Sequence, residues 1–232
     1  MNEGFLNNLW NALQLILAWD TELVRIVGLS LFVSGAAVLI AALFAIPLGT
    51  FLGLKNSKWV RYISKIIYTF MGLPPVVAGL VVFLLLSKSG PLGILELLWT
   101  PWAMIIAQVM LALPIITGLT MTAIKSKDQA IGKTALTLGA SKYQAALAVI
   151  REARIAIISA IVAGLGRVIA EVGAVMMVGG NIQGKTRVMT TAIVLETRKG
   201  NFEMALSLGI ILLVLAFIIN SILMTIQGET DD

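Results

Sequence analysis

The chain contains no cysteine and no histidine among its 232 residues. Without cysteine there is neither a disulfide framework nor a thiolate metal site. Without histidine, the commonest general base and metal ligand is missing. Charged residues are also scarce, at 12% of the chain, whereas a soluble domain carries about 25%. We therefore expect no catalytic residue, no metal and no cofactor in this chain.

Apolar residues are abundant instead, at 59% of the chain, which is more than a soluble fold of this size needs. A membrane span takes about 20 mainly apolar residues. Five segments qualify, at residues 26–54, 62–86, 102–124, 156–178 and 204–226. We therefore predict an all-α polytopic membrane protein with five transmembrane helices.

Residues 5–19 precede these spans and are apolar at helical spacing, but four polar amide side chains interrupt them. At about 1.5 Å per residue, this stretch is too short to cross a membrane comfortably. We predict that residues 1–22 form an N-terminal helix lying in the outer membrane interface. A short sixth span, which would place the N-terminus inside, is the alternative.

The lysines and arginines predict the orientation of the chain. The loop after the first span and the loop at 125–154 lie on the same side and together carry ten of them, against six on the other side. Because cytoplasmic loops carry the positive excess, the first group is assigned to the cytoplasm. The net charge of +5 then marks loops beside lipid and not a nucleic-acid partner. We expect a multi-pass plasma-membrane protein with a cytoplasmic tail at 227–232.

Residues 179–186 read GGNIQGKT, which matches the phosphate-binding pattern G-x-x-x-x-G-K-[ST]. A functional phosphate loop lies between a strand and a helix, whereas an apolar helix is predicted before this octapeptide. No hydrophobic strand ending in an aspartate follows to hold Mg²⁺, and the segment falls on the outer side. We predict a glycine-rich turn that binds no nucleotide, with Gly179-Gly180 ending the helix and Gly184 making a second turn.

The 125–154 loop is predicted to be helical throughout, with one break. Gly139 suits the left-handed position that ends a helix. Ser141 and Gln144 form an S-x-x-Q capping box that opens the next helix. The loop also carries small and apolar residues, which are Ala135, Gly139, Ala140, Ser141, Leu136, Leu138, Tyr143, Leu147, Val149 and Ile150. A solvated connector would not need them, so we favour a surface on which a partner docks.

This loop carries a family resemblance. Residues 134–141, TALTLGAS, resemble the E-A-A-x-x-x-G loop of ABC importer permeases, with threonine at the usual glutamate position. Two further stretches, MGLPPVVAGLVVFLLLSKSGPLG at 71–93 and GRVIAEVGAVMMVGGNI at 166–182, resemble spans of the molybdate, sulfate and tungstate permeases. The stretch MTTAIVLETRKGNFEMAL at 189–206 is most similar to the tungstate branch.

The resemblance implies a type I ABC importer core, with residues 23–226 as the transmembrane domain. Two copies would form one pore, a cytoplasmic ATPase dimer would dock below, and an extracytoplasmic binding protein would deliver tungstate from above. Molybdate or sulfate is the alternative cargo. The chain would be a transport subunit and no enzyme. Its contacts with the ATPase would come from the 125–154 loop, at Thr134, Ala135, Leu136, Gly139, Ala140 and Ser141.

Charges within the spans are few. A dianion in a low-dielectric medium faces a cost of tens of kcal/mol on paper, so its pathway must be polar or wet. Arg167 and Glu171 are the exceptions, spaced i,i+4 on one face of the fourth predicted span, where they can pair. They belong either to the pathway or gate, or to a structural pair. The break at Pro74-Pro75 is likewise either a gate element or a structural kink.

Two other function classes compete with the importer. A proton-coupled secondary carrier would use Arg167 and Glu171 as a relay, but the docking loop and the lack of a visible inverted repeat argue against it. An intramembrane hydrolase needs a nucleophile with a base or a metal dyad. No predicted span offers one, since Glu171 is the only acid at depth.

Overall fold

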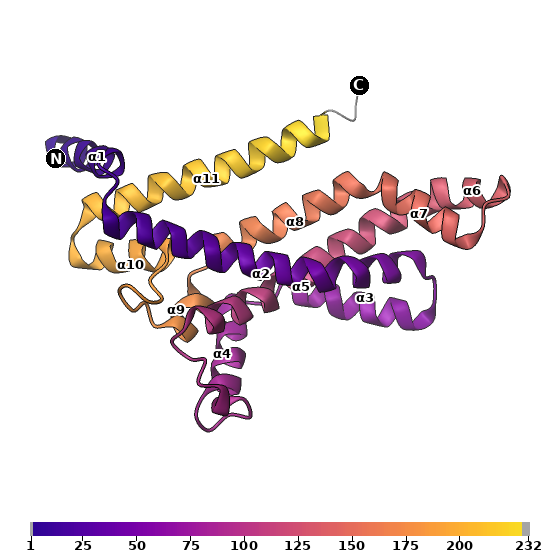
Figure 1. Cartoon of the computed structure of the whole chain (residues 1–232), viewed down its shortest axis with the longest axis horizontal. Coiled ribbons are helices and arrows are strands. Elements are labelled where there is room, and N and C mark those ends of the chain that lie inside the picture. Colours follow the sequence, from indigo (N-terminus) through magenta and orange to yellow (C-terminus); the bar gives the residue numbers. More distant parts are fainter. Residues whose placement is uncertain (1, 229–232) are drawn as a thin grey trace. The chain divides into compact units, whose positions relative to one another are not determined.

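The computed structural model describes the backbone of residues 2–228 and the side chains of residues 7–127 and 130–225. All regular elements in that part of the chain are helices, in the order of Figure 1. They are α1 (Asn2–Leu17), α2 (Thr21–Leu54), α3 (Lys58–Met71), α4 (Pro75–Leu86), η1 (Gly93–Leu95), α5 (Pro101–Lys127), η2 (Asp128–Gly132), α6 (Lys133–Thr137), α7 (Lys142–Glu152), α8 (Arg154–Ile169), α9 (Gly173–Gly179), α10 (Met189–Lys199) and α11 (Phe202–Gly228). The all-α prediction is therefore confirmed for the described residues.

Three helices, α2, α5 and α11, are long and apolar enough to cross a membrane by themselves. Two broken pairs, α3 with α4 and α8 with α9, each reach the same length and hydropathy when taken together. Counting each pair as one span gives up to five spans in the described residues, as predicted. The prolines at 47 and 114 lie inside α2 and α5 without ending them.

The second predicted span is broken where its prolines predicted a break. α3 ends at Met71, and the N–H of Gly72 donates to the Thr69 carbonyl at 3.1 Å to cap it. α4 begins at Pro75, a position that suits proline because the first N–H of a helix has no intrahelical partner. The proline pair therefore separates two helices and does not merely kink one.

The fourth predicted span, 156–178, is not a single helix, and this part of the prediction is wrong. α8 ends at Ile169 and α9 begins at Gly173. Between them, Glu171 Oε1 accepts the N–H of Ala174 at 3.1 Å, and the Glu171 carbonyl accepts the hydroxyl of Thr190 at 2.8 Å. These bonds replace those that a continuous helix would make. Arg167 and Glu171 therefore do not lie on one helical face.

The N-terminal helix α1 packs against the first turns of α11. Asn11 Nδ2 donates to Glu203 Oε1 at 2.6 Å, and Ser207 Oγ donates to the Ala12 carbonyl at 3.1 Å. The predicted helix is therefore present, although α2 already begins at Thr21. Its place in the outer interface stays a prediction. At the other end, α11 includes the first two residues of the predicted 227–232 tail, and residues 229–232 lie outside the described residues.

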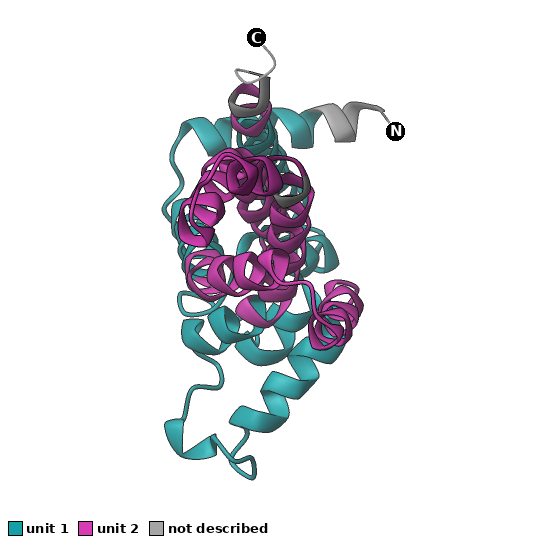
Figure 2. Cartoon of the chain, turned by 90° about the vertical axis from the view of Figure 1, so that its right-hand side faces the viewer, with its two compact units in different colours: residues 1–36, 75–108, 169–220 teal, residues 37–74, 109–168, 221–232 magenta. Residues whose placement is uncertain are grey.

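The chain divides into two compact units, coloured in Figure 2. Unit 1 comprises residues 1–36, 75–108 and 169–220, and unit 2 comprises residues 37–74, 109–168 and 221–232. The core of unit 1 is formed by Leu23, Ile26, Ile169, Met189, Ala192 and Leu208. In unit 2 a buried cluster is formed by Ile124, Val149, Ala153 and Ile157.

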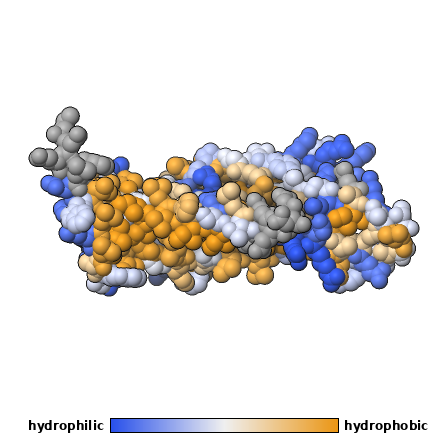
Figure 3. All heavy atoms as spheres, turned by 90° about the horizontal axis from the view of Figure 1, so that it is seen from above, coloured by the Kyte–Doolittle hydropathy of each residue, from blue (hydrophilic) through white to orange (hydrophobic). Residues whose placement is uncertain are grey.

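Large hydrophobic side chains remain exposed along the long helices. On α2, Leu39 and Leu43 are 72% and 69% exposed, and on α11 Leu213 and Phe217 are 72% and 73% exposed. Figure 3 shows such residues, in orange, over a broad part of one face. Soluble monomers rarely expose contiguous apolar patches of this kind. These helix faces therefore suit contact with lipid.

Candidate functional site

The turn between α6 and α7 has the form predicted from the sequence. Gly139 has a φ of +87°, the left-handed conformation that glycine adopts without strain. Its N–H donates to the Leu136 carbonyl at 3.1 Å, and the N–H of Ala140 donates to the Ala135 carbonyl at 3.0 Å. A Cβ on Gly139 would meet no atom within 4 Å. Glycine is therefore favoured here by the left-handed backbone conformation, since an added Cβ would meet no steric clash.

The capping box that opens α7 is also confirmed. Ser141 Oγ accepts the N–H of Gln144 at 3.3 Å, and Gln144 Oε1 accepts the N–H of Ser141 at 2.8 Å. Two N–H groups that the helix leaves unpaired are thereby satisfied. The bend between the two short helices is fixed by local sequence, so its shape does not depend on a partner.

The inner side of α7 holds the loop in place. Val149 is fully buried against Ile124, Ala153 and Ile157, with Ile150 packed on this cluster. Val149 and Ile150 were predicted as part of the docking surface, and the structure gives them an anchoring role instead. An exposed ion pair between Lys127 and Glu152, at 3.6 Å, adds little to this anchor.

The outer side of the loop presents apolar residues to solvent. Leu138 and Tyr143 are 83% and 78% exposed, and Leu136 is 47% exposed. None of the six residues predicted to contact the ATPase is buried. Thr134, at the usual glutamate position, donates its hydroxyl to the Ala130 carbonyl at 2.7 Å within the helical backbone. The loop is thus a rigid hairpin of helices with an apolar tip.

A second assembly lies in unit 1, where the starts of α4 and α9 meet. A Cβ on Gly173 would lie 3.0 Å from Val76 Cγ2, and a Cβ on Gly79 would lie 2.7 Å from the Cα of Ala174. Such contacts are possible only between helices with small residues at the crossing. Figure 1 shows α4 and α9 together. Two broken helices therefore present adjacent N-terminal ends.

The predicted pathway residues are divided by this arrangement. Pro75 is the first residue of α4, and Glu171, only 5% exposed, lies just before α9 with its carboxylate on the N–H of Ala174. Pro74 and Arg167 belong to unit 2, with Arg167 in the last turn of α8. The structure brings Pro75 and Glu171 to one junction. The pairing of Arg167 with Glu171 stays a prediction.

The octapeptide at 179–186 folds as a closed turn. Gly180 and Gly184 have φ values of +70° and +71°, as predicted for two glycine turns. The Ile182 carbonyl accepts the N–H groups of Lys185 and Arg187, both at 3.1 Å, and that of Thr186 at 2.9 Å. A phosphate loop must point such N–H groups at its ligand. Here one carbonyl of the same turn takes all three.

Sequence reasoning missed a polar cluster that follows this turn. Arg187 Nη1 pairs with Glu22 Oε1 at 3.0 Å, and Gln183 Nε2 donates to the same oxygen at 2.8 Å. Glu196 accepts from Lys199 Nζ at 2.9 Å and from an amide side chain at position 201 at 3.0 Å. Glu22 and Arg187 lie 165 positions apart, so no local pattern marks the pair.

The surroundings of the Glu196 carboxyl displace its pKa. Burial acts to raise the pKa of Glu196. The hydrogen bonds from Lys199 and Asn201, together with the charges of Lys199 and Arg187, outweigh burial and lower this pKa below its usual value of 4.5. The carboxylate is therefore ionised at neutral pH and holds the end of α10 to the turn that follows.

Membrane-length helices, an exposed helical hairpin and two broken spans together characterise a polytopic membrane subunit. The chain belongs to the family described as binding-protein-dependent transport system inner membrane component, which matches residues 45–228. It is therefore a multi-pass membrane component of a transport system that depends on a binding protein.

Curated proteins with similar sequences are permease subunits of anion transporters. The tungstate uptake system permease protein TupB of Peptoclostridium acidaminophilum is 44% identical over 218 residues, covering 94% of this chain and 96% of that protein. A probable anion ABC transporter permease protein of Haloferax volcanii is 44% identical over 207 residues, covering 87% and 89%. The TupB protein of Campylobacter jejuni is 37% identical over 211 residues, covering 91% and 88%. This chain is thus similar to permease subunits, and the family resemblance drawn from the sequence is confirmed.

A solved structure shares the fold. One chain of a bacterial ABC transporter that imports the acidic polysaccharide alginate superposes with a TM-score of 0.70 at 17% identity, covering 100% of this chain and 91% of that one. The same kind of transporter in complex with an alginate-bound periplasmic protein gives a TM-score of 0.66 at 19% identity, covering 96% and 86%. At such identities the likeness shows the fold alone.

Proposed function

We propose that this chain is the permease subunit of an ATP-driven tungstate importer of the plasma membrane. The observation that carries the proposal is the 44% identity to a tungstate uptake permease over nearly the whole of both chains. The chain itself supplies the path through the membrane. We assign ATP hydrolysis to a partner, because the Ile182 carbonyl already accepts the N–H groups that a phosphate loop would turn toward a nucleotide.

The docking surface for that ATPase is the coupling loop, residues 125–154. A buried anchor at Val149 fixes the loop to its unit, while Leu138 and Tyr143 stand in solvent on the opposite side. Apolar side chains exposed on a rigid hairpin are what a groove on a partner can bury. The coupling loop lies on the cytoplasmic side in the orientation set by the lysines and arginines.

A second copy of the chain completes the pore. In unit 2 an open groove of about 510 Å³ runs between α5 and α8, lined by small residues such as Ala123, Ala156, Ala160 and Ala163. Small side chains let helices approach closely in a membrane. A groove of this kind suits the packing of two permease copies about the pore, and an extracytoplasmic binding protein delivers the oxyanion on the outer side.

The pathway runs past the broken helices. Oxyanions are favoured at helix N-termini, and the ends of α4 and α9 supply two of them at one junction. Glu171 lies there as a resident carboxylate, so a dianion meets positive helix ends without being held tightly. Arg167 contributes fixed positive charge along the path, and the break at Pro74 and Pro75 gives the gate its hinge.

Uptake by reconstituted vesicles tests the proposed cargo. The permease, its ATPase and its binding protein are reconstituted together, and tungstate, molybdate and sulfate are offered separately. We expect ATP-dependent accumulation of tungstate at concentrations where sulfate is not accumulated. Accumulation of molybdate or sulfate in preference to tungstate would reassign the cargo, and accumulation without ATP would make the chain a secondary carrier.

A double substitution tests the pathway role of Arg167. Changing Arg167 and Glu171 together to glutamine removes both charges, so neither is left unpaired in the membrane, and the amide introduced in place of Glu171 keeps an oxygen for the N–H of Ala174. We expect a folded complex that transports poorly at subsaturating tungstate. Uptake at the level of the unchanged protein would exclude a pathway role and leave a structural pair.

A further inference from the structure

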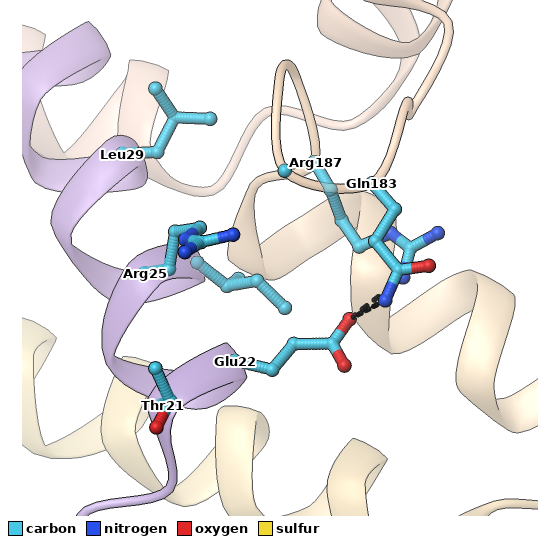
Figure 4. Close-up of a pocket in the computed structure, with 8 residues that line it drawn as sticks. Thr21, Glu22, Arg25, Leu29, Gln183 and Arg187 are labelled. Atoms are coloured by element: carbon cyan, nitrogen blue, oxygen red, sulfur yellow. Dashed lines mark hydrogen bonds and ion pairs between the residues drawn. The ribbon is translucent and has the colours of Figure 1, made fainter.

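A cavity of about 220 Å³ lies within unit 1, between the start of α2 and the turn that precedes α10. Its charged and polar lining comes from Thr21, Glu22 and Arg25 on α2 and from Gln183 and Arg187 on the turn. Figure 4 shows Glu22 reaching across to Gln183 and Arg187, with Arg25 above it on the same helix. A single water needs only about 10–15 Å³ of such space, so the cavity has room for a hydrated polyatomic ion.

The donors around this cavity are not all used. Arg187 is 8% exposed and gives Nη1 to Glu22 Oε1, while its buried Nε has no acceptor among the described residues. Arg25 makes no hydrogen bond or ion pair with any described side chain, and its Nη1 lies 3.6 Å from the point where a Cβ on Gly184 would sit. The guanidinium of Arg25 therefore lies beside the turn at Gly184.

The charge of the cavity favours an anion. Two guanidinium groups face a single carboxylate, which leaves a net charge of +1 before any ligand arrives. The planar fork of arginine matches the paired oxygens of an oxyanion, and such charge-assisted bonds are the strong ones. Glu22 already satisfies one of these arginines, so an incoming anion competes with it.

We propose that this cavity binds a tetrahedral oxyanion dianion between Arg25 and Arg187, with Glu22 as an internal competitor that keeps the binding weak. The inference rests on the proposed function, because the oxyanion is its cargo and the cavity opens on the outer side in the proposed orientation. A weak site serves an importer, since the ion must leave it again. The turn that imitates a phosphate loop would thus hold an oxyanion through its flanking arginine and not through its backbone.

Because Glu22 competes with the anion, removing its charge is expected to strengthen binding. Glu22→Gln keeps an oxygen that can accept from Gln183 and Arg187 but removes the competing charge, so tungstate should bind about tenfold more tightly. Arg25→Gln, at an exposed position, should weaken binding by about tenfold. Arg198→Gln removes the same charge from an exposed site on α10 outside the cavity and should change nothing.

Binding is measured by equilibrium dialysis of tungstate against the full chain and its ATPase in lipid nanodiscs, at low ionic strength and without the binding protein. Sulfate and phosphate should displace tungstate, because the site reads tetrahedral oxygens and charge. An unchanged dissociation constant for Arg25→Gln would overturn the proposal. Binding that is unchanged or weaker in Glu22→Gln would also overturn it. Such a result would show that Glu22 forms a structural ion pair and does not compete with the anion.

Two further arms separate the alternatives. If Arg25→Gln weakens association with the binding protein but leaves dialysis unchanged, the cavity receives a protein side chain and the proposal is wrong. Vesicle uptake by the unchanged complex tests the proposed function by itself. If the unchanged complex takes up tungstate but neither cavity variant changes binding in dialysis, the cavity proposal is wrong and the proposed function stands. If both variants change binding in dialysis as expected but the complex imports no tungstate, the cargo assignment is wrong and the cavity proposal stands.

Discussion

Two glycine turns in this chain use the same backbone conformation in opposite surroundings. Gly139, between α6 and α7, has a φ of +87°, and Gly180, at the end of α9, has a φ of +70°. A Cβ on Gly139 would meet nothing within 4 Å, whereas a Cβ on Gly180 would lie 2.6 Å from Trp99 Cε3. The first turn is open surface that a partner can reach, and the second is closed by the ring packed on it.

The closed turn is tied to its neighbours through Trp99. The N–H of Trp99 donates to the Val178 carbonyl at 3.0 Å, and its ring meets the ring of Phe83 on α4 edge to face, with centroids 6.0 Å apart. The open turn is held by hydrogen bonds within the loop itself, from the N–H groups of Gly139 and Ala140 and within the capping box of α7. The comparison shows that the same backbone conformation is held by tertiary packing at Gly180 and by local hydrogen bonds at Gly139.

The largest effect is expected at the open turn. Gly139→Trp places a bulky ring on the coupling loop, which should leave the spans folded but reduce ATPase co-purification and tungstate-stimulated hydrolysis by on the order of tenfold or more. Gly200→Trp is the matched control, because Gly200 also has a positive φ, of +77°, and open space around its Cβ, yet it follows α10. Equal losses in both variants would mean that Gly139 matters only for folding.

At the closed turn, alanine should be enough to cause damage. Gly180→Ala adds a Cβ against the Trp99 ring in a left-handed conformation, and overpacking with this strain should cost about 2–4 kcal/mol of the free energy of unfolding. Gly200→Ala carries the conformational strain alone, at about 1 kcal/mol. Thermal unfolding of the two variants in detergent measures the difference. If both shift alike, the ring contact at Gly180 is looser than the structure shows.

The open turn could be predicted from the sequence because its causes are local. Gly139, Ser141 and Gln144 lie within six positions, and each acts through its own backbone or its close neighbour. The break before α9 was not predicted from the sequence. One of its two hydrogen bonds is local, from the N–H of Ala174 to the Glu171 carboxylate, but the other joins the Thr190 hydroxyl to the Glu171 carbonyl from 19 positions away. A proline is visible in the sequence and predicts a helix break, whereas a hydrogen bond between distant residues leaves no local pattern.

The same contrast between local and distant causes separates the spans, which were predicted, from the cavity, which was not. In the sequence, Arg187 counts only as one of the outer positive charges and nothing singles out Glu22, since their pairing joins residues 165 positions apart. The long helices were readable because hydropathy is a sum over neighbours, and α2, α5 and α11 fall where it predicted spans. Val149 was misassigned because an apolar residue on a loop can face either a partner or its own core, and only packing decides.

A smaller effect is expected from Glu196, whose pKa lies below 4.5 in the folded chain. A lowered pKa stabilises the fold at pH values above the unfolded pKa, and this stability is lost as the pH falls through the folded value. Glu196→Gln should therefore be less stable than the unchanged chain at pH 7 by up to about 1 kcal/mol, and the gap should close below pH 4.5. Thermal unfolding from pH 3.5 to 7 measures it. A gap that widens in acid would contradict the sign of the shift.

The smallest effect is expected at Lys185, the residue that makes the outer turn look like a phosphate loop. Its side chain is exposed, and its N–H is already given to Ile182, so Lys185→Ala should leave ATP hydrolysis by the assembled complex within about twofold. The neighbouring Thr186 differs, because its buried hydroxyl accepts the N–H of Ile182 and donates to the Gly179 carbonyl. Thr186→Ala strands both groups and should cost about 1–3 kcal/mol of stability without changing the ATP concentration at half-maximal hydrolysis. In a phosphate loop the order would be reversed, since the lysine contacts the nucleotide directly. A hundredfold fall in hydrolysis for Lys185→Ala, with assembly intact, would place the turn on the ATPase side of the membrane and overturn the orientation proposed for the chain.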